Sequence, residues 1–192
     1  IQLCRELFDY PDAVCTLDPT LLLPAAEYQK LVPDDMMPRE KEVVAYFLDS
    51  ILPKLEVLQR VASWKSCAAV NLLADNYEYN NSCPKPIVPS IEEWLSHISN
   101  AEFVLTDSFH GLAFSILFHR QFVVFCNPQR GNSRIESLLS LLGLQDRMVR
   151  DISFQVVKQV LSNKIDYSQA DQKLQECRSF AFSFLQNCLN KE

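Results

Sequence analysis

The sequence predicts an α/β fold in which helices flank a parallel, Rossmann-like sheet. The prediction rests on two strand-helix-strand units. In the first, an apolar strand at residues 42–48 precedes an amphipathic helix at residues 53–64 and a strand at residues 67–74. In the second, an apolar helix separates strands at residues 101–105 and 122–125. Strands joined by such helical crossovers run parallel, and apolar runs are typical of a sheet covered on both faces.

Helix-start signals place further elements around this sheet. Ser90 with Glu93 three residues later has the pattern of a capping box, which predicts the start of a helix. Ser133 with Glu136 repeats the pattern, so Arg134 falls in the first turn of another helix.

The remaining segments have weaker patterns. Residues 1–8 read as the end of a helix, residues 13–17 as a strand, and residues 75–89, rich in asparagine and proline, as a loop. Residues 168–190 predict a long helix, because their apolar side chains recur at helical spacing and form a packing face.

Composition narrows the class of protein. The 192 residues are 48% apolar and 22% charged, which is ordinary for a globular chain, and the formal net charge of −6 argues against a basic nucleic-acid-binding face. No stretch approaches the ~18 apolar residues of a membrane-spanning helix. The seven cysteines are widely spaced and predict reduced thiols in a cytoplasmic chain. The three histidines lack metal-ligand spacing, so no metal site is expected.

Residues 106–111, Thr-Asp-Ser-Phe-His-Gly, lie where an apolar strand turns into a helix. The ligand crevice of a parallel α/β sheet opens at the carboxyl ends of its strands. The first N–H groups of the helix and the positive end of its dipole suit a phosphate or a carboxylate. The candidate donors are the backbone N–H groups of Ser108, Phe109 and Gly111.

His110 stands out within this segment. On a helical projection it lies opposite Ser115 and on the side of Ala113 and Leu117, so it is a polar group heading an apolar face. It can be a structural histidine that hydrogen-bonds a neighbouring loop, or an acid/base or anion-binding group, and the spacing leaves both open. Asp107 can cap the helix or orient His110, and capping is the favoured interpretation.

Arg134 is a second candidate for binding an anion. The helix dipole disfavours a cation in the first turn, so its position suggests a bound anion, with Arg130 in the loop beside it. The alternative is a surface arginine that pairs with Glu136 or Asp146.

Several motifs follow one another along residues 18–147. They are Asp18-Pro19-Thr20-Leu21-Leu22-Leu23, Val43-Val44-Ala45-Tyr46-Phe47-Leu48, Pro89-Ser90 with Glu92-Glu93-Trp94, Asn100-Ala101, Asp107-Ser108-Phe109-His110-Gly111 with Phe114-Ser115, and Asn132 with Arg134-Ile135, Leu138-Leu139, Leu144 and Arg147. In this order they resemble the polysaccharide pyruvyl transferase family. The most specific blocks are Ser-Phe-His-Gly and the Asn-x-Arg-Ile that follows it.

The resemblance implies a fold like that of GT-B enzymes, with two Rossmann-like domains facing a cleft. It also implies a transferase that moves the enolpyruvyl carbons of phosphoenolpyruvate onto paired sugar hydroxyls of a polysaccharide as a ketal. Phosphoenolpyruvate would be a co-substrate, with no cofactor. Such chemistry needs an acid, a base and positive charge at the leaving phosphate. The resulting assignments are His110 as the catalytic residue and, for donor binding, Ser108, Phe109, Gly111, Arg130 and Arg134.

Two departures from the family pattern bear on the site. One branch of the family has Arg-Leu-His-Gly where this chain has Ser108 and Phe109 before the histidine, so another cation must neutralise the donor. The usual Lys-Pro-Phe after the helix is here Arg120-Gln121-Phe122, which keeps the positive charge and loses the proline.

The resemblance suggests a division of the chain. Residues 1–40 would hold the end of an N-terminal domain and the inter-domain connection, residues 41–165 the Rossmann-like C-terminal domain, and residues 166–192 a helix that crosses back. The chain opens without methionine, so we expect a missing N-terminal domain and an inactive isolated chain. The acceptor would be a sugar or a lipid-linked oligosaccharide, met in the cytoplasm or at the inner face of the membrane.

Two other functions fit the same residues. A GT-B-type glycosyltransferase would hold the diphosphate of a nucleotide sugar at the same helix start. A non-catalytic fragment could bind a sugar or an anion without reaction. An enolpyruvyl donor needs recognition at both its carboxylate and its phosphate, whereas a nucleotide needs an apolar slot for its base.

Overall fold

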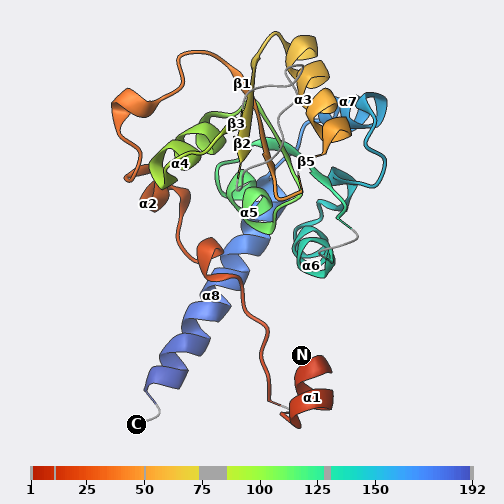
Figure 1. Cartoon of the computed structure of the whole chain (residues 1–192). Helices are drawn as coiled ribbons and strands as arrows, with labels where there is room; N and C mark the ends of the chain where they lie inside the picture. Colours follow the sequence, from red (N-terminus) through yellow and green to blue (C-terminus); the bar gives the residue numbers. More distant parts are fainter. Residues whose placement is uncertain (1, 11, 50, 74–85, 128–130, 191–192) are drawn as a thin grey trace.

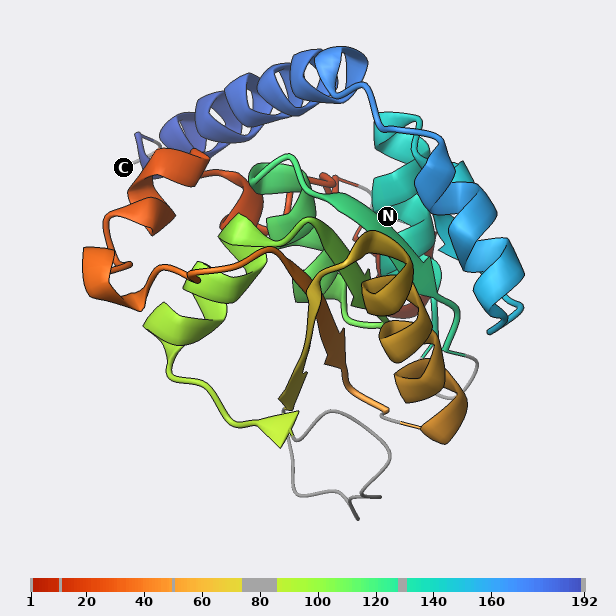
Figure 2. The same ribbon diagram turned by 90° about the horizontal axis from the view of Figure 1, so that it is seen from above.

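Six strands form one parallel sheet in the order β3-β2-β1-β4-β5-β6. The computed structural model describes residues 2–10, 12–49, 51–73, 86–127 and 131–190, and the strand count refers to these residues. Helices cover both faces of the sheet (Figures 1 and 2). The predicted α/β fold with a Rossmann-like parallel sheet is confirmed.

The elements follow the order expected of crossover connections. The strands are β1 (Glu42–Phe47), β2 (Ala68–Leu73), β3 (Pro86–Ile87), β4 (Phe103–Thr106), β5 (Gln121–Phe125) and β6 (Met148–Val149). The α-helices are α1 (Gln2–Phe8), α2 (Ala25–Gln29), α3 (Leu52–Lys65), α4 (Ile91–Asn100), α5 (Phe109–Leu117), α6 (Ser133–Leu142), α7 (Phe154–Ser162) and α8 (Ser168–Leu189). Short 3-10 turns are η1 (Pro19–Leu21), η2 (Asp34–Met36) and η3 (Gln145–Arg147).

The two central strands are β1 and β4. Val44 of β1 lies in register with Val104, and Leu105 lies in register with Val123 of β5. Every residue of β4 is buried, as expected of a strand covered on both faces. Leu105 and Thr106 therefore lie in the centre of the sheet, and the polar segment after them begins at its carboxyl edge.

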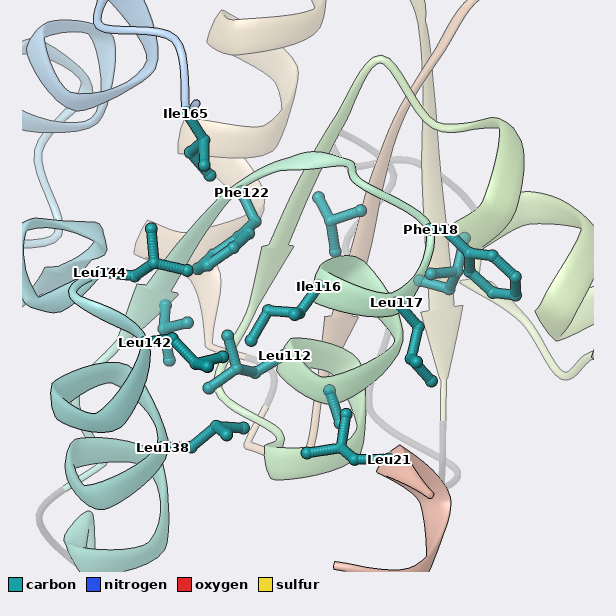
Figure 3. Close-up of a cluster of buried hydrophobic side chains, with 14 of the residues drawn as sticks. Leu21, Leu112, Ile116, Leu117, Phe118, Phe122, Leu138, Leu142, Leu144 and Ile165 are labelled. Atoms are coloured by element: carbon teal, nitrogen blue, oxygen red, sulfur yellow. The ribbon is translucent and has the colours of Figure 1, made fainter. Parts of the chain in front are cut away.

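Two apolar cores hold the layers together. Helices α4, α5, α6 and α8 pack on one face of the sheet, and α3 and α7 pack on the other. Figure 3 shows the first core, where Leu112 and Ile116 of α5 lie among Phe122, Leu138 and Leu142. Alternating strand residues supply the two cores, so the period-two pattern of the strands fixes which helices meet which side chains.

The predicted packing face of α8 is only partly buried. Leu174 and Ala181 pack inward, whereas Phe180 and Leu185 are exposed. Figure 1 shows why: the last turns of α8, in blue, extend beyond the sheet, and α1 lies apart from α8. Among the helices of the described residues, none combines the length and apolar character that a membrane crossing requires.

Three local predictions were wrong or stay outside the described residues. Residues 13–17 join no strand within the described chain, because only Leu17 is buried there and it packs as a single anchor. The predicted loop at residues 75–89 contains the short strand β3, while residues 74–85 lie outside the described part. Ser133 is the first residue of α6 and does not cap it, because Asn132 occupies the cap position.

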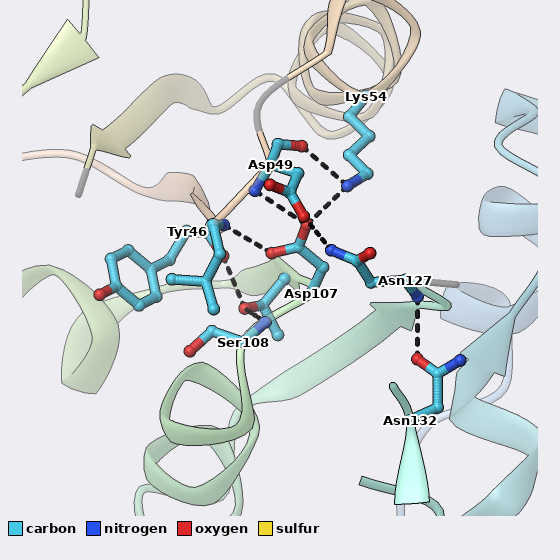
Figure 4. A network of polar contacts seen from close by, with 9 residues as sticks. Tyr46, Asp49, Lys54, Asp107, Ser108, Asn127 and Asn132 are labelled. Carbon is cyan, nitrogen blue, oxygen red and sulfur yellow. Dashed lines mark hydrogen bonds and ion pairs between the residues drawn. The ribbon is translucent and has the colours of Figure 1, made fainter. Parts of the chain in front are cut away.

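A buried ion pair between Lys54 and Asp107 ties the carboxyl edge of the sheet together (Figure 4). Lys54 Nζ lies 2.6 Å from Asp107 Oδ2, and the two side chains are 4% and 0% exposed. Asp107 also accepts hydrogen bonds from the backbone N–H groups of Leu48, at 2.6 Å, and Asp49, at 3.3 Å. Lys54 donates a further bond to the Asp49 carbonyl at 2.9 Å. The loops after β1 and β4 are therefore joined by one charge network.

We predict that Asp107→Asn lowers the free energy of unfolding by about 3–5 kcal/mol, because the ammonium of Lys54 is then left buried without its counter-charge. Urea unfolding followed by circular dichroism measures the change. The double variant Lys54→Met/Asp107→Asn removes the stranded charge, and we expect it to recover part of the loss.

Lys30→Met is the matched control. Lys30 also forms an ion pair at 2.8 Å, with Glu27, but its side chain is 67% exposed. We expect a change of about 0–1 kcal/mol there. Equal losses in Asp107→Asn and Lys30→Met would contradict a special role for the buried pair.

Candidate functional site

The start of α5 is held against β4 by a threonine and a glycine. Thr106 Oγ1 donates to the Tyr46 carbonyl at 2.6 Å and accepts the Ser108 N–H at 3.0 Å. A Cβ on Gly111 would lie 2.3 Å from Thr106 Oγ1, so only glycine allows this approach. Ser108 caps the helix, since its hydroxyl accepts the Gly111 N–H at 3.4 Å. The first turn of α5 is thus fixed directly above the central strand.

His110 is the second residue of α5 and is exposed to solvent. Its ring meets the ring of Phe109 edge to face, with centroids 5.7 Å apart. Ala113 and Leu117, with which it shares a face on the projection, are buried. His110 therefore stays exposed although residues on the same side of the helix are buried. It makes no hydrogen bond to a described residue, so no loop partner for it is seen within the described part of the chain.

The segment before α2 brings a carboxylate to this helix start. Asp18 accepts the Thr20 N–H at 3.1 Å and so caps η1. Leu21, fully buried, anchors η1 in the core beneath α5 (Figure 3). Arg178 of α8 donates to the Leu21 carbonyl at 2.6 Å, and Tyr28 donates to the Thr20 carbonyl at 2.9 Å. Asp18 is therefore held in place from three separate elements.

Asp18, His110, Phe109 and Arg134 form one cluster. Arg134 Nη2 lies 2.9 Å from Asp18 Oδ2, and its guanidinium carbon lies 4.1 Å over the Phe109 ring. Burial raises the pKa of Asp18, but hydrogen bonds from Thr20 and the charges of His110 and Arg134 outweigh it and lower the pKa below its ordinary value of 3.8. The carboxylate is consequently ionised at neutral pH, between two basic side chains.

A pocket of about 530 Å³ opens beside this cluster. It lies between residues 15–21 and the first turns of α5 and α6, and Asp18, Phe109 and Arg134 all contribute to its lining. The volume is within the range of small-molecule sites. Two helix starts and one basic side chain meet a single opening, which is an arrangement suited to an anionic ligand.

The backbone donors differ from those predicted. The N–H groups of Ser108 and Gly111 already bond Thr106 and the Ser108 hydroxyl, so they are not available to an anion. The first two helical positions, Phe109 and His110, have no intrahelical acceptor for their N–H groups. The side of the helix start that can receive an anion is therefore formed by the amides of Phe109 and His110.

Two further site predictions need correction. Asp107 does not cap α5, because its carboxylate is turned away from the helix toward Leu48, Asp49 and Lys54. Arg134 lies in the first turn of α6 as predicted, but its partner is Asp18 and not Glu136 or Asp146. Arg130 lies outside the described residues, so its predicted part in the site is not tested by the structure.

Sequence reasoning missed the partners that support the site. Asn127 follows β5; its side chain donates to Asp49, and its N–H donates to Asn132 Oδ1 at 2.8 Å (Figure 4). Asp18 and Asn132 stood in the recognised motifs without an assigned role. Lys54 carried one usable signal, namely a charged residue among the apolar positions of an amphipathic helix.

The comparison with protein families agrees with the motifs up to residue 127. The model of the polysaccharide pyruvyl transferase family matches residues 3–127. A search of curated proteins gives no match. One similar solved structure is described as the crystal structure of the glycotransferase of kitacinnamycin, with 17% sequence identity and a TM-score of 0.47. That alignment covers 74% of this chain and 39% of the other, so the chain spans about two fifths of that protein.

We predict that Asp18→Asn destabilises the chain at neutral pH by at most about 1 kcal/mol, because its partner Arg134 is largely exposed. Asparagine keeps an acceptor for the Thr20 N–H and loses only the charge. Because the pKa of Asp18 is lower in the folded chain, its ionised carboxylate stabilises the fold above pH 3.8. This contribution is lost as the pH falls through the folded-state pKa. The two proteins should therefore converge in acid, as measured by urea unfolding at neutral pH and well below pH 3.8.

Asp35→Asn serves as the control, since Asp35 is exposed on η2 and forms no ion pair with a described residue. It should match the unmodified chain at both pH values. If the difference in the free energy of unfolding between Asp18→Asn and the unmodified chain persisted unchanged in acid, the effect would come from packing and not from charge.

Proposed function

The chain belongs to the polysaccharide pyruvyl transferase family, and on that premise we propose that it binds phosphoenolpyruvate at the starts of α5 and α6 and transfers its pyruvyl carbons to a sugar. The family is one of transferases that modify polysaccharides. The single observation that carries the finer proposal is the cluster of His110, Arg134 and Asp18 beside an open pocket at the carboxyl edge of the sheet.

The proposed reaction assigns the proton steps to His110. One sugar hydroxyl adds to C2 of phosphoenolpyruvate, while an acid protonates C3 to a methyl group. A second hydroxyl then replaces the phosphate at C2, which leaves as inorganic phosphate and completes the ketal. The hydroxyls release two protons and C3 takes up one, so a base is also required. His110 is exposed at the helix start with both ring nitrogens free of described hydrogen-bond partners, which suits a group that must give and receive protons.

Charge recognition is proposed for Arg134 and the first amides of α5. The donor carries a carboxylate and a phosphate, and its phosphate gains charge as it leaves. Arg134 supplies a guanidinium at the pocket, and the N–H groups of Phe109 and His110 supply donors at a positive helix end. Arg134 thus takes the role of the cation that Ser108 does not provide. Arg130 would contribute less.

A further domain is proposed to complete the cleft. Residues 1–40 would connect to it, residues 41–165 would form the donor-binding domain, and α8 would cross back to it. Under this proposal the acceptor, a sugar or a lipid-linked oligosaccharide, lies between the two domains, in the cytoplasm or at the inner face of the membrane. Activity is therefore to be measured on the complete protein.

We predict that His110→Ala abolishes phosphate release from phosphoenolpyruvate in the presence of a sugar acceptor, while the thermal midpoint stays nearly unchanged. The side chain is exposed, so its removal leaves no cavity in the core. A colorimetric phosphate assay on the complete protein, with a panel of hexose-containing glycans, measures the reaction. His97→Gln, which can still donate to Glu42, is the control and should remain active. Unchanged turnover in His110→Ala would assign the proton steps to another residue.

We predict that Arg134→Ala weakens phosphoenolpyruvate binding by at least about 1.5–3 kcal/mol, the worth of a hydrogen bond to a charged group. Isothermal titration against phosphoenolpyruvate measures the loss, with a nucleotide sugar as the comparison ligand. Arg130→Ala should lose less. Asp18→Asn should bind more tightly, because it releases Arg134 from its internal partner.

Lys173→Ala is the control for a general loss of positive charge, since Lys173 is exposed on α8 and paired with Glu176. Preferred binding of the nucleotide sugar would favour a glycosyltransferase. Unchanged phosphoenolpyruvate affinity in both arginine variants would mean that the cation that binds the donor lies in another part of the protein.

A further inference from the structure

A second pocket, of about 380 Å³, lies at the opposite edge of the sheet. Its floor includes Phe103 and Gln121, the first residues of β4 and β5, so it opens at the amino ends of the strands. We propose that this pocket binds a small dianion, of the phosphate monoester or dicarboxylate class, independently of the donor site. None of the described residues assigned to the donor site lines it.

The charges around the pocket are predominantly positive. Lys65, Arg120 and Lys164 contribute to its lining, on a chain whose formal net charge is −6. Glu102 is the one carboxylate among the residues that line the pocket in the described chain, and it is directed toward Lys41 at 3.9 Å. His119, which also contributes, pairs with Asp171 at 2.8 Å. Three cations and one carboxylate thus line the opening, which leaves it with a net positive formal charge.

Arg120 is held in place without a carboxylate. Its Nε donates to the Phe118 carbonyl at 2.7 Å, and its Nη1 donates to the Ala101 carbonyl at 3.5 Å. A guanidinium has five N–H donors in a fixed fork, so these bonds fix its orientation and leave other donors for a ligand. The neutral carbonyls cancel none of its charge.

The two lysines are differently placed. Lys65 Nζ lies 3.9 Å from the centre of the Trp64 ring and 4.9 Å from that of Phe103, so cation–π contacts hold its ammonium group near these rings. Lys164 is exposed and has no hydrogen-bond or ion-pair partner among the described residues. Besides Arg120, the pocket therefore has one lysine held by aromatic contacts and one exposed lysine without a described partner.

The size and lining define the ligand class. A pocket of this volume lies at the lower end of small-molecule sites. Phe103 is almost fully buried, so its ring offers no face on which a nucleobase could stack. Three cations favour a doubly charged ligand over a monoanion, because each charge of the ligand adds to the Coulombic attraction. Phosphate monoesters and dicarboxylates share this chemistry.

The position of the pocket separates it from the proposed donor site. Helix α5 has His110 in its first turn at the carboxyl edge of the sheet and is followed by His119 and Arg120 at the amino edge. The two sites therefore lie at opposite ends of one helix, and each can be probed without the other.

The test is a titration of the chain with inorganic phosphate, followed by the amide resonances in ¹H-¹⁵N spectra. We expect the amides of Glu102, Arg120 and Gln121 to shift, with malonate as the dicarboxylate comparison. Stronger binding of phosphate would indicate a phosphate monoester as the ligand, and stronger binding of malonate would indicate a dicarboxylate. Lys164→Gln and Lys65→Gln should each weaken the affinity at these amides by roughly tenfold or more, as expected for one lost charge-assisted contact.

Two controls separate this site from the donor site. Lys173→Gln removes an exposed lysine elsewhere on the chain and should leave the affinity unchanged. Arg134→Ala should also leave it unchanged, whatever its effect on phosphoenolpyruvate. Shifts confined to Phe109 and His110, or an affinity insensitive to both Lys164→Gln and Lys65→Gln, would overturn the proposal.

Discussion

The buried ion pair of Lys54 and Asp107 is the interaction on which the carboxyl edge of the sheet depends. A charge removed from water is tolerated only with a partner and full hydrogen bonding, and the carboxylate here has both. Asp107 directly precedes Ser108, so the same network that joins the loops after β1 and β4 also sets where α5 begins. Any displacement of the Asp49 loop or of α3 would shift the helix start that carries His110.

Gly111 shows how closely sequence and backbone are coupled at this point. Its backbone is helical, so glycine is required here for space and not for a positive φ. The space is taken by Thr106, whose hydroxyl is engaged by both Tyr46 and Ser108 and cannot turn away without losing two hydrogen bonds. The helix start is consequently locked by contacts that lie underneath it, and the exposed side of its first turn stays open for a ligand.

The sequence predicted the sheet and its crossovers because apolar runs and helical spacing are local properties. The four long strands, α3, α5 and α8 follow from such patterns, and so does the position of residues 106–111. The partners of the site residues were not predictable, since Asp18 meets Arg134 across 116 residues and Asp107 meets Lys54 across 53. From sequence alone, a short polar side chain next to a helix start is equally compatible with capping the helix and with bonding elsewhere. Only the neighbouring groups in the folded chain determine which partner it binds. Strand β3 has two residues, too few to produce a period.

The two ion pairs at this edge differ in a way that matters for ligand binding. Lys54 and Asp107 are almost completely buried, so separating them would strand a charge, and no ligand gains enough to compensate. Arg134 is 64% exposed in its pair with Asp18, and such a pair contributes only about 0–1 kcal/mol. A hydrogen bond to a charged group is worth about 1.5–3 kcal/mol, which exceeds that value. An anion can therefore take Arg134 from Asp18 at little cost, while the buried pair keeps the helix start in position as the exchange occurs.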